Sequence, residues 1–108
     1  MATADLSVLP LGHAERSSSR YIAEIQRCLA AQNRVRYKMH AMGTLLEGTA
    51  ADIFALVAQL HAIPVEQGVP RVYTVLKLDE RLDRPGQTLD DKVRAVEMHL
   101  REPPPPES

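Results

Sequence analysis

Apolar and polar residues alternate along three segments of the chain, and this period of two predicts a β-strand in each, while a shorter segment directly after Gly43 is expected to form a fourth strand. The four segments are residues 3–11, 35–42, 44–48 and 71–79. Only Gly43 separates the second segment from the third, and a glycine can accept a tight turn or a bulge. These two segments are therefore expected to form a hairpin.

Three further segments carry apolar residues at helical spacing, and each begins near a residue that can cap a helix. The first helix is expected from the serines at 17–19 to about Gln32, the second between Thr49 and Gly68, and the third from Thr88 with an apolar stripe that reaches Leu100. Thr49 and Asp52 form a Thr-x-x-Asp capping pattern, and Gly68 stands where a C-terminal cap belongs. Pro64 falls inside the second helix and is expected to bend or break its last turns, since proline lacks a backbone N–H.

The predicted order is strand, helix, strand, strand, helix, strand and a final helix. This order is typical of a ferredoxin-like α+β fold (βαββαβ), in which two helices cover one face of a four-stranded antiparallel sheet, here with an extra C-terminal helix. Residues 1–101 are expected to form this single domain, and residues 102–108 a proline-rich disordered tail.

The uncovered face of the predicted sheet combines polar and apolar side chains. It would carry Asp5, Ser7, Tyr73, Lys77 and Asp79. This mixture is too polar for a second core and too apolar for ordinary solvent surface. The face is therefore expected to serve as an oligomer contact, a ligand site or both.

The charges of the chain nearly balance, with 13 Lys and Arg against 14 Asp and Glu and a formal net charge of −1. This balance argues against a nucleic-acid partner and against a membrane surface, because both kinds of binding favour a basic excess. A domain of 108 residues buries a limited share of its surface and has a small free energy of unfolding, so self-association would add stability. The one cysteine, with no signal-peptide pattern and no long apolar stretch, favours a soluble cytoplasmic protein.

No catalytic signature is found in the sequence. It lacks a nucleophile elbow, a phosphate-binding loop, a dinucleotide fingerprint and the zinc-protease helix motif. One cysteine and four scattered histidines do not supply the spacing of a tetrahedral zinc site. We therefore assign no catalytic residue, metal or cofactor, and expect that the chain is not an enzyme.

Four segments carry a more specific resemblance. They are DLSVLPLG at residues 5–12, YKMHAMGTLLEG at 37–48, His61 with the following QGVPRV up to Val72, and TVLKLDERLD at 74–83. In these segments the chain resembles the small thiamine-binding proteins, single-domain relatives of the YkoF-type proteins that bind thiamine and its hydroxymethylpyrimidine moiety. The resemblance implies a ferredoxin-like fold, dimers that assemble into tetramers, and ligand binding without turnover. Ala41 departs from the family pattern, because a proline is common before Met-Gly-Thr.

The chemistry of an aminopyrimidine suggests which residues would hold it. Its ring nitrogens and exocyclic amine suit a carboxylate and hydroxyl groups, and its flat ring suits an apolar or aromatic wall. The candidate carboxylate, hydroxyls and wall are, in that order, Glu47, Ser7 with Thr44, and Tyr37 with Met39. Glu47 shares the uncovered sheet face with Ser7 only if Leu46 packs on the helices.

A structural interpretation of each candidate stays open. Glu47 precedes a helix, whose N-terminal dipole favours a negative charge. Ser7 and Thr44 can be ordinary strand residues, and Tyr37 and Met39 can be packing or interface residues.

Two functions are consequently compatible with the sequence. The first is non-catalytic binding of thiamine or its hydroxymethylpyrimidine moiety, for carriage, buffering or sensing. The alternative is a structural or regulatory homo-oligomeric module with no small-molecule ligand. In both cases we expect a homo-oligomer, a dimer or tetramer, that forms through the uncovered sheet face and the edge strands.

Overall fold

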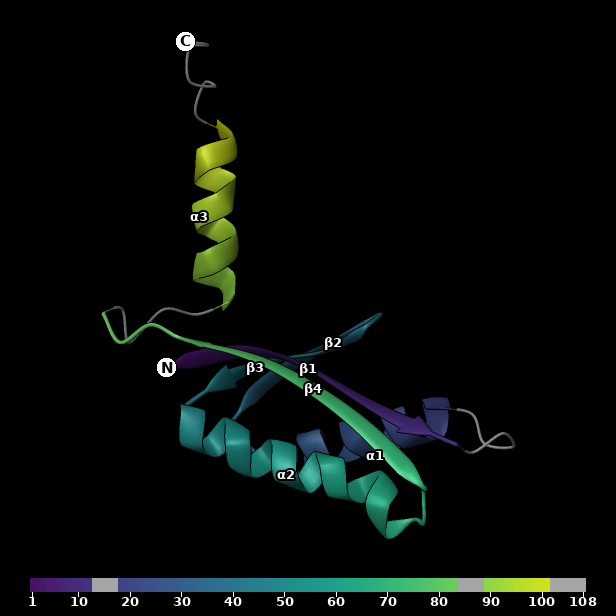
Figure 1. Ribbon diagram of the computed structural model, residues 1–108. Coiled ribbons are helices and arrows are strands. Elements are labelled where there is room, and N and C mark those ends of the chain that lie inside the picture. The colour runs from purple at the N-terminus through teal and green to yellow at the C-terminus, as the bar shows by residue number, and fades with distance from the viewer. Residues whose placement is uncertain (13–17, 84–88, 102–108) are drawn as a thin grey trace.

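The computed structural model describes residues 1–12, 18–83 and 89–101 (Figure 1). Its elements are β1 (Ala2–Leu11), α1 (Ser18–Ala30), β2 (Arg36–His40), β3 (Gly43–Gly48), α2 (Ala50–Glu66), β4 (Arg71–Glu80) and α3 (Leu89–Arg101). These elements follow the predicted order. Ser17, the first of the three serines predicted to cap α1, the predicted cap Thr88 and the proline-rich tail at 102–108 lie outside the described residues.

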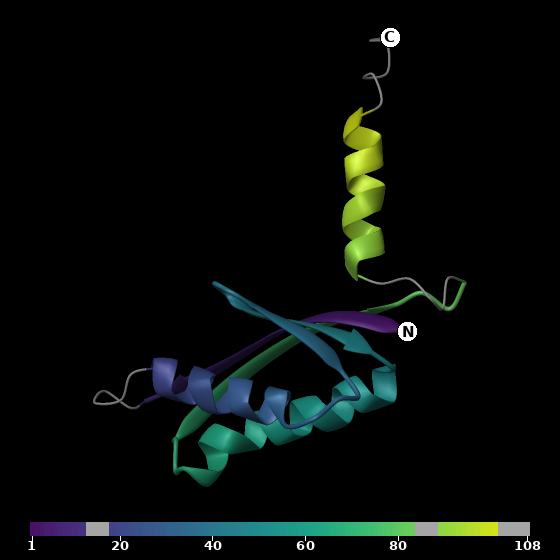
Figure 2. The same ribbon diagram turned by 180° about the vertical axis from the view of Figure 1, so that it is seen from behind.

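The four strands form one antiparallel sheet in the order β2-β3-β1-β4. Figures 1 and 2 show α1 and α2 beneath this sheet, both on the same face, with the opposite face left uncovered by them. This arrangement confirms the ferredoxin-like α+β fold with an additional C-terminal helix.

The hydrophobic core lies between the sheet and the two covering helices. Leu46 of β3 is fully buried there, together with Leu29 of α1 and Ile53 of α2. Because successive side chains of a strand point to opposite faces, the burial of Leu46 directs Glu47 to the uncovered face. The condition for Glu47 to share a sheet face with Ser7 is thus met.

The two ends of helix α2 lie next to the residues that were predicted to cap it, Thr49 and Gly68. The side-chain oxygen of Thr49 accepts a hydrogen bond from the backbone N–H of Asp52 at 3.1 Å. Gly68 follows the helix with a φ of +78°, a conformation that glycine adopts without steric cost. The helix nevertheless continues through the buried Pro64 to Glu66, so proline does not end it at its own position.

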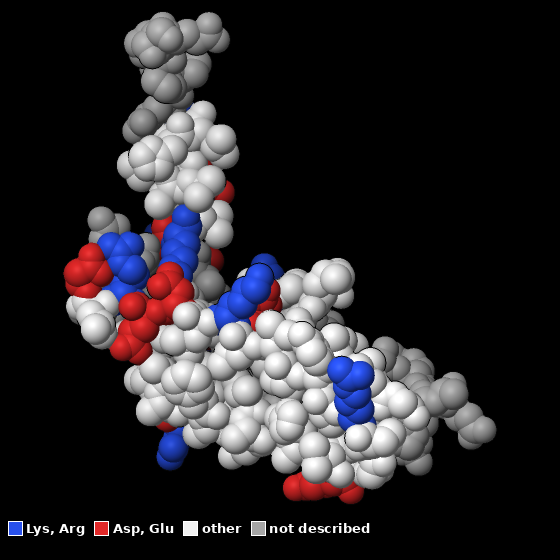
Figure 3. Space-filling view, viewed as in Figure 1, with Lys and Arg blue, Asp and Glu red and all other residues white. Residues whose placement is uncertain are grey.

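Helix α3 rises from the uncovered side of the sheet and points away from it (Figure 1). Near its start, Lys92 donates a hydrogen bond to Thr3 Oγ1 at 2.6 Å and forms an ion pair with Asp79. Figure 3 shows charged side chains gathered where β4 ends and α3 begins. Arg81 lies in this region, and its hydrogen bond to Asp83 raises the pKa of the guanidinium.

Candidate functional site

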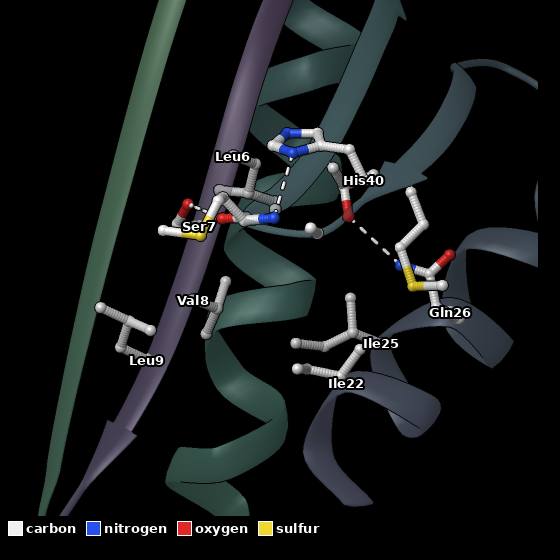
Figure 4. A pocket seen from close by; sticks show the side chains of 13 residues that line it. Leu6, Ser7, Val8, Leu9, Ile22, Ile25, Gln26 and His40 are labelled. Atoms are coloured by element: carbon white, nitrogen blue, oxygen red, sulfur yellow. Dashed lines mark hydrogen bonds between the residues drawn. The ribbon is translucent and has the colours of Figure 1, made fainter. Parts of the chain in front are cut away.

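The sheet is incomplete beside the second half of β1. β1 pairs with β4 from Ala2 to Leu11, but its pairing with β3 ends at Leu6, which lies opposite Thr44. Beyond Leu6, the β2–β3 turn and α1 border the space next to β1, and a cavity of about 200 Å³ lies there (Figure 4). We call this space the hairpin cavity.

The wall of the hairpin cavity is mostly apolar, with a few polar side chains. The apolar residues are Leu6, Val8, Leu9, Ile22, Ile25, Met39, Ala41 and Met42, and the polar side chains belong to Ser7, Gln26, His40 and Thr44. Apolar walls with a few convergent polar groups are the usual composition of a small-molecule site. Figure 4 shows that Ser7 comes from β1, Gln26 from α1 and His40 from β2, so the site exists only in the folded chain.

Three hydrogen bonds link the β2–β3 turn to β1, one directly and two through His40. Ser7 Oγ donates to the backbone oxygen of Met42 at 2.9 Å, and the backbone N–H of Met42 donates to His40 Nδ1 at 3.2 Å. The other ring nitrogen of His40, Nε2, lies 2.8 Å from Asp5 Oδ1. The turn that borders the hairpin cavity is therefore held through both the backbone N–H and the backbone carbonyl of Met42.

Gly43 permits this close approach of the turn to β1. A Cβ atom at this position would lie 2.4 Å from the backbone oxygen of Leu6 and 2.9 Å from Ser7 Oγ. The sequence suggested Gly43 as the turn residue, but the structure places it inside β3 and leaves the turn to Ala41 and Met42. A glycine is needed at position 43 because a side chain would not fit there. Gly43 has no left-handed backbone, since the described glycines with positive φ are Gly12 and Gly68.

Thr44 points to the helix-covered side of the sheet, because it pairs with the core residue Leu6. Its side-chain oxygen accepts a hydrogen bond from Gln26 Nε2 at 3.2 Å. Sequence reasoning missed Gln26. Its only local signal is its place next to Ile25, a member of the apolar stripe of the first helix.

A second cavity, of about 420 Å³, lies over β2, β3 and the start of α3. Its lining residues are Arg36, Tyr37, Lys38, Leu45, Glu47, Asp90 and Val93. Glu47 is 6% exposed, and its Oε1 accepts a hydrogen bond from Arg36 Nη1 at 3.1 Å. This arrangement places a buried carboxylate in the cavity, whereas Tyr37 pairs with the core residue Leu46, so its side chain points to the helix-covered face. We call this second cavity the carboxylate cavity.

The structure separates the five predicted site residues into two groups. Ser7, Met39 and Thr44 line the hairpin cavity, whereas Tyr37 and Glu47 line the carboxylate cavity. Glu47 pairs with Thr3, which is four positions from Ser7 along β1, or about 13 Å at the rise of an extended strand. A single pyrimidine ring cannot contact both groups within one chain.

Two further observations limit the chemistry of the described part of the chain. No three His, Cys, Asp or Glu side chains of residues 1–12, 18–83 and 89–101 are grouped so that they could hold a metal ion. None of the helices described has both the length and the apolar character required to cross a bilayer. His61 Nδ1 lies 2.6 Å from Thr74 Oγ1, between α2 and β4, and His61 is not among the lining residues of either cavity.

Comparison with curated proteins finds relatives that match nearly the whole chain. It is 36% identical over 104 residues to the UPF0045 protein YqgV of Bacillus subtilis, a match that covers 94% of this chain and 99% of the relative. It is 42% identical over 97 residues to a UPF0045 protein of Methanothermobacter thermautotrophicus, covering 89% and 96% of the two chains. A family model described as thiamine-binding protein matches residues 4–97.

Comparison with solved structures finds the same fold. The hypothetical protein MJ1052 of Methanocaldococcus jannaschii superposes with a TM-score of 0.78 at 29% identity, over 89% of this chain and 95% of that one. A Thermotoga maritima protein described as a candidate thiamine biosynthesis/salvage protein superposes with a TM-score of 0.72 at 22% identity, over 88% and 97%. At that identity the second likeness supports the fold alone.

Proposed function

Because this chain belongs to the thiamine-binding protein family, we propose that it binds thiamine or its hydroxymethylpyrimidine moiety without changing it chemically. The observation that carries the proposal is the hairpin cavity, whose apolar wall surrounds two hydroxyl groups, an amide and an imidazole. The proposed role is carriage, buffering or sensing of this ligand in the cytoplasm.

The size of the hairpin cavity favours a single ring. Its volume of about 200 Å³ is below the roughly 300–1,000 Å³ of pockets that enclose drug-sized molecules. We propose that the pyrimidine ring enters the cavity, with Met39 on its wall and Thr44 as a hydrogen-bonding partner on the same face, whereas Ser7 points to the other face and donates to Met42. The thiazolium ring of thiamine would then remain outside.

The carboxylate cavity suits a positively charged group. Glu47 supplies a buried negative charge, which Arg36 pairs from the exposed side of the cavity. We propose that Glu47 contacts a cationic ligand group there, separately from the pyrimidine in the hairpin cavity.

Isothermal titration calorimetry tests the proposal with three ligands: thiamine, hydroxymethylpyrimidine and the isolated thiazole. We expect saturable heat with the two pyrimidine-containing ligands and a much weaker response to the thiazole. Val8→Phe would fill the hairpin cavity and should abolish pyrimidine binding. Val57→Phe is the matched control, because Val57 packs against the core and is not among the lining residues of the cavity. The absence of heat with every pyrimidine-containing ligand would refute the proposal.

A structural oligomeric module is the second candidate function. The observation that favours it is the exposed pair Leu9 and Tyr73, which lie opposite each other on the uncovered sheet face. A partner subunit that occupies this face without leaving a ligand cavity would explain the exposure of both side chains. A well-defined oligomer that binds none of the three ligands would support this alternative.

A further inference from the structure

Helix α3 carries an apolar stripe that no described part of its own chain covers. Val93, Val96 and Leu100 follow one another at helical spacing, and these residues are 56%, 59% and 78% exposed. Every residue from 93 to 101 is exposed. A helix of 13 residues is only marginally stable in water by itself, so the stripe of α3 requires a surface to pack against.

The first turns of α3 fix the place where the helix leaves the sheet. Lys92 donates a hydrogen bond to Thr3 and forms an ion pair with Asp79. Thr3 and Asp79 are cross-strand partners at one end of the uncovered face. From this anchor α3 points away from its own sheet, as Figures 1 and 2 show. The stripe therefore lies where it can meet a second molecule, and not over the far end of its own sheet.

The far end of the uncovered face carries a second exposed apolar surface. Leu9 and Tyr73 are cross-strand partners there, and Leu11 lies on the same face of β1. Six positions of extended strand separate Thr3 from Leu9, which corresponds to about 20 Å. A helix of 13 residues is also about 20 Å long. The uncovered face is thus long enough to accommodate the whole of one α3 helix.

Charged side chains beside these two surfaces have opposite signs. Glu97 lies at the border of the stripe on α3, and Lys77 lies on the same face of β4 as Tyr73. Both are exposed, and neither forms an ion pair with a described residue of its own chain. The stripe and the face are therefore complementary in charge as well as in apolar character.

We propose that α3 of one molecule packs on the uncovered sheet face of a second copy of this chain, and that the second copy makes the same contact in return. Each molecule then supplies one helix and one face, and the pair closes by twofold symmetry. Contact between two α3 helices alone would leave Leu9 and Tyr73 exposed, and contact between two sheets alone would leave the stripe exposed. The reciprocal contact covers both surfaces, and it does not depend on the ligand.

Two substitutions test this contact, because each damages only one of the two surfaces. Val96→Glu places a charge in the stripe and leaves the sheet face intact, whereas Tyr73→Lys places a charge on the face and leaves α3 intact. Both positions are exposed and lie outside the core, so both variants should keep the circular dichroism spectrum of the wild-type chain. In sedimentation velocity the wild-type chain should self-associate, and each variant alone should be a monomer at the same concentration.

A mixture of the two variants then distinguishes a helix-to-face contact from other contacts. In the mixed pair, the unchanged α3 of the Tyr73→Lys chain meets the unchanged face of the Val96→Glu chain. At the second contact the two introduced charges have opposite signs. We therefore expect the mixture to associate at a concentration where each variant alone is a monomer. Met98→Glu is the control on the same helix, because Met98 is 63% exposed on the side of α3 opposite the stripe and should leave self-association unchanged.

The other outcomes would overturn the proposal. A wild-type monomer, or two variants that stay monomeric when mixed, would exclude the reciprocal contact. Dissociation by Val96→Glu and not by Tyr73→Lys would indicate a contact between two α3 helices, and the reverse result a contact between two sheets. Dissociation by Met98→Glu as strong as that by Val96→Glu would show that the stripe is not the contact surface.

Discussion

His40 connects β2 to β1 through Asp5, since His40 Nε2 lies 2.8 Å from Asp5 Oδ1 while His40 Nδ1 accepts the backbone N–H of Met42 at 3.2 Å. The acceptor role of Nδ1 places the proton of the neutral ring on Nε2, which then donates to Asp5. One side chain thus holds the turn that borders the hairpin cavity and is itself oriented by a carboxylate on β1, two strands away in the sheet.

The first prediction concerns this orientation of the turn. His40→Ala should weaken binding of hydroxymethylpyrimidine about tenfold, because the turn loses its bond from Met42 N–H and the cavity loses part of its wall. His40→Asn should recover more affinity than His40→Gln, since the asparagine oxygen can replace Nδ1 as the acceptor. Calorimetric titration of the three variants measures both effects.

The matched control for His40 is His61→Ala. His61 also makes a side-chain hydrogen bond to a strand residue, but to Thr74 and outside the lining of the cavity. The His61→Ala variant should have lower thermal stability and an unchanged affinity for the ligand. Equal losses of affinity in His40→Ala and His61→Ala would show that binding follows general stability and not the turn.

The fold and the faces of its strands were predictable because each rests on a local period. Leu46 and Glu47 are adjacent, and alternation alone sends them to opposite faces once one of them is known to be buried. The pattern left that choice open, since Leu45 and Leu46 are both apolar. The core settles it, because Leu46 packs with residues of both covering helices.

The hairpin cavity was not predictable from local patterns. It depends on where β3 stops pairing with β1, and nothing in the alternation of either strand marks Leu6 as the last paired residue. The sequence also gives no sign that Gln26 belongs to the site, because a polar residue next to the apolar stripe of a helix is common. Only its contact with Thr44, eighteen positions away in sequence, identifies it.

The second prediction concerns the tight contact at Gly43. Gly43→Ala should destabilise the chain by about 2 kcal/mol or more, because its new Cβ would lie 2.4 Å from backbone, which cannot move aside as a flexible side chain can. Gly48→Ala is the control within the same strand, since its Cβ would meet its nearest atom at 3.3 Å. Denaturant unfolding should place Gly43→Ala well below Gly48→Ala in stability, and similar midpoints would contradict the steric argument.

The third prediction separates the two cavities. Glu47→Gln should weaken thiamine binding about fivefold, because the carboxylate no longer attracts the thiazolium charge, and should leave the neutral hydroxymethylpyrimidine nearly unaffected. Asp79→Asn is the control, because Asp79 forms an ion pair with Lys92 and is absent from the lining of both cavities. If both variants change thiamine affinity equally, Glu47 has no ligand role and serves its ion pair with Arg36.

The fourth prediction concerns self-association through the uncovered sheet face. Tyr73 and Leu9 are cross-strand partners there, 50% and 47% exposed, and burial of both against a second subunit would remove a large apolar area from water. Tyr73→Lys should therefore shift the chain toward the monomer in sedimentation velocity. Phe54→Lys is the matched control, because Phe54 is 56% exposed on α2, which lies against the other face of the sheet. A wild-type monomer would refute self-association, and an oligomer that Phe54→Lys disrupts and Tyr73→Lys does not would place the subunit contact away from the uncovered face.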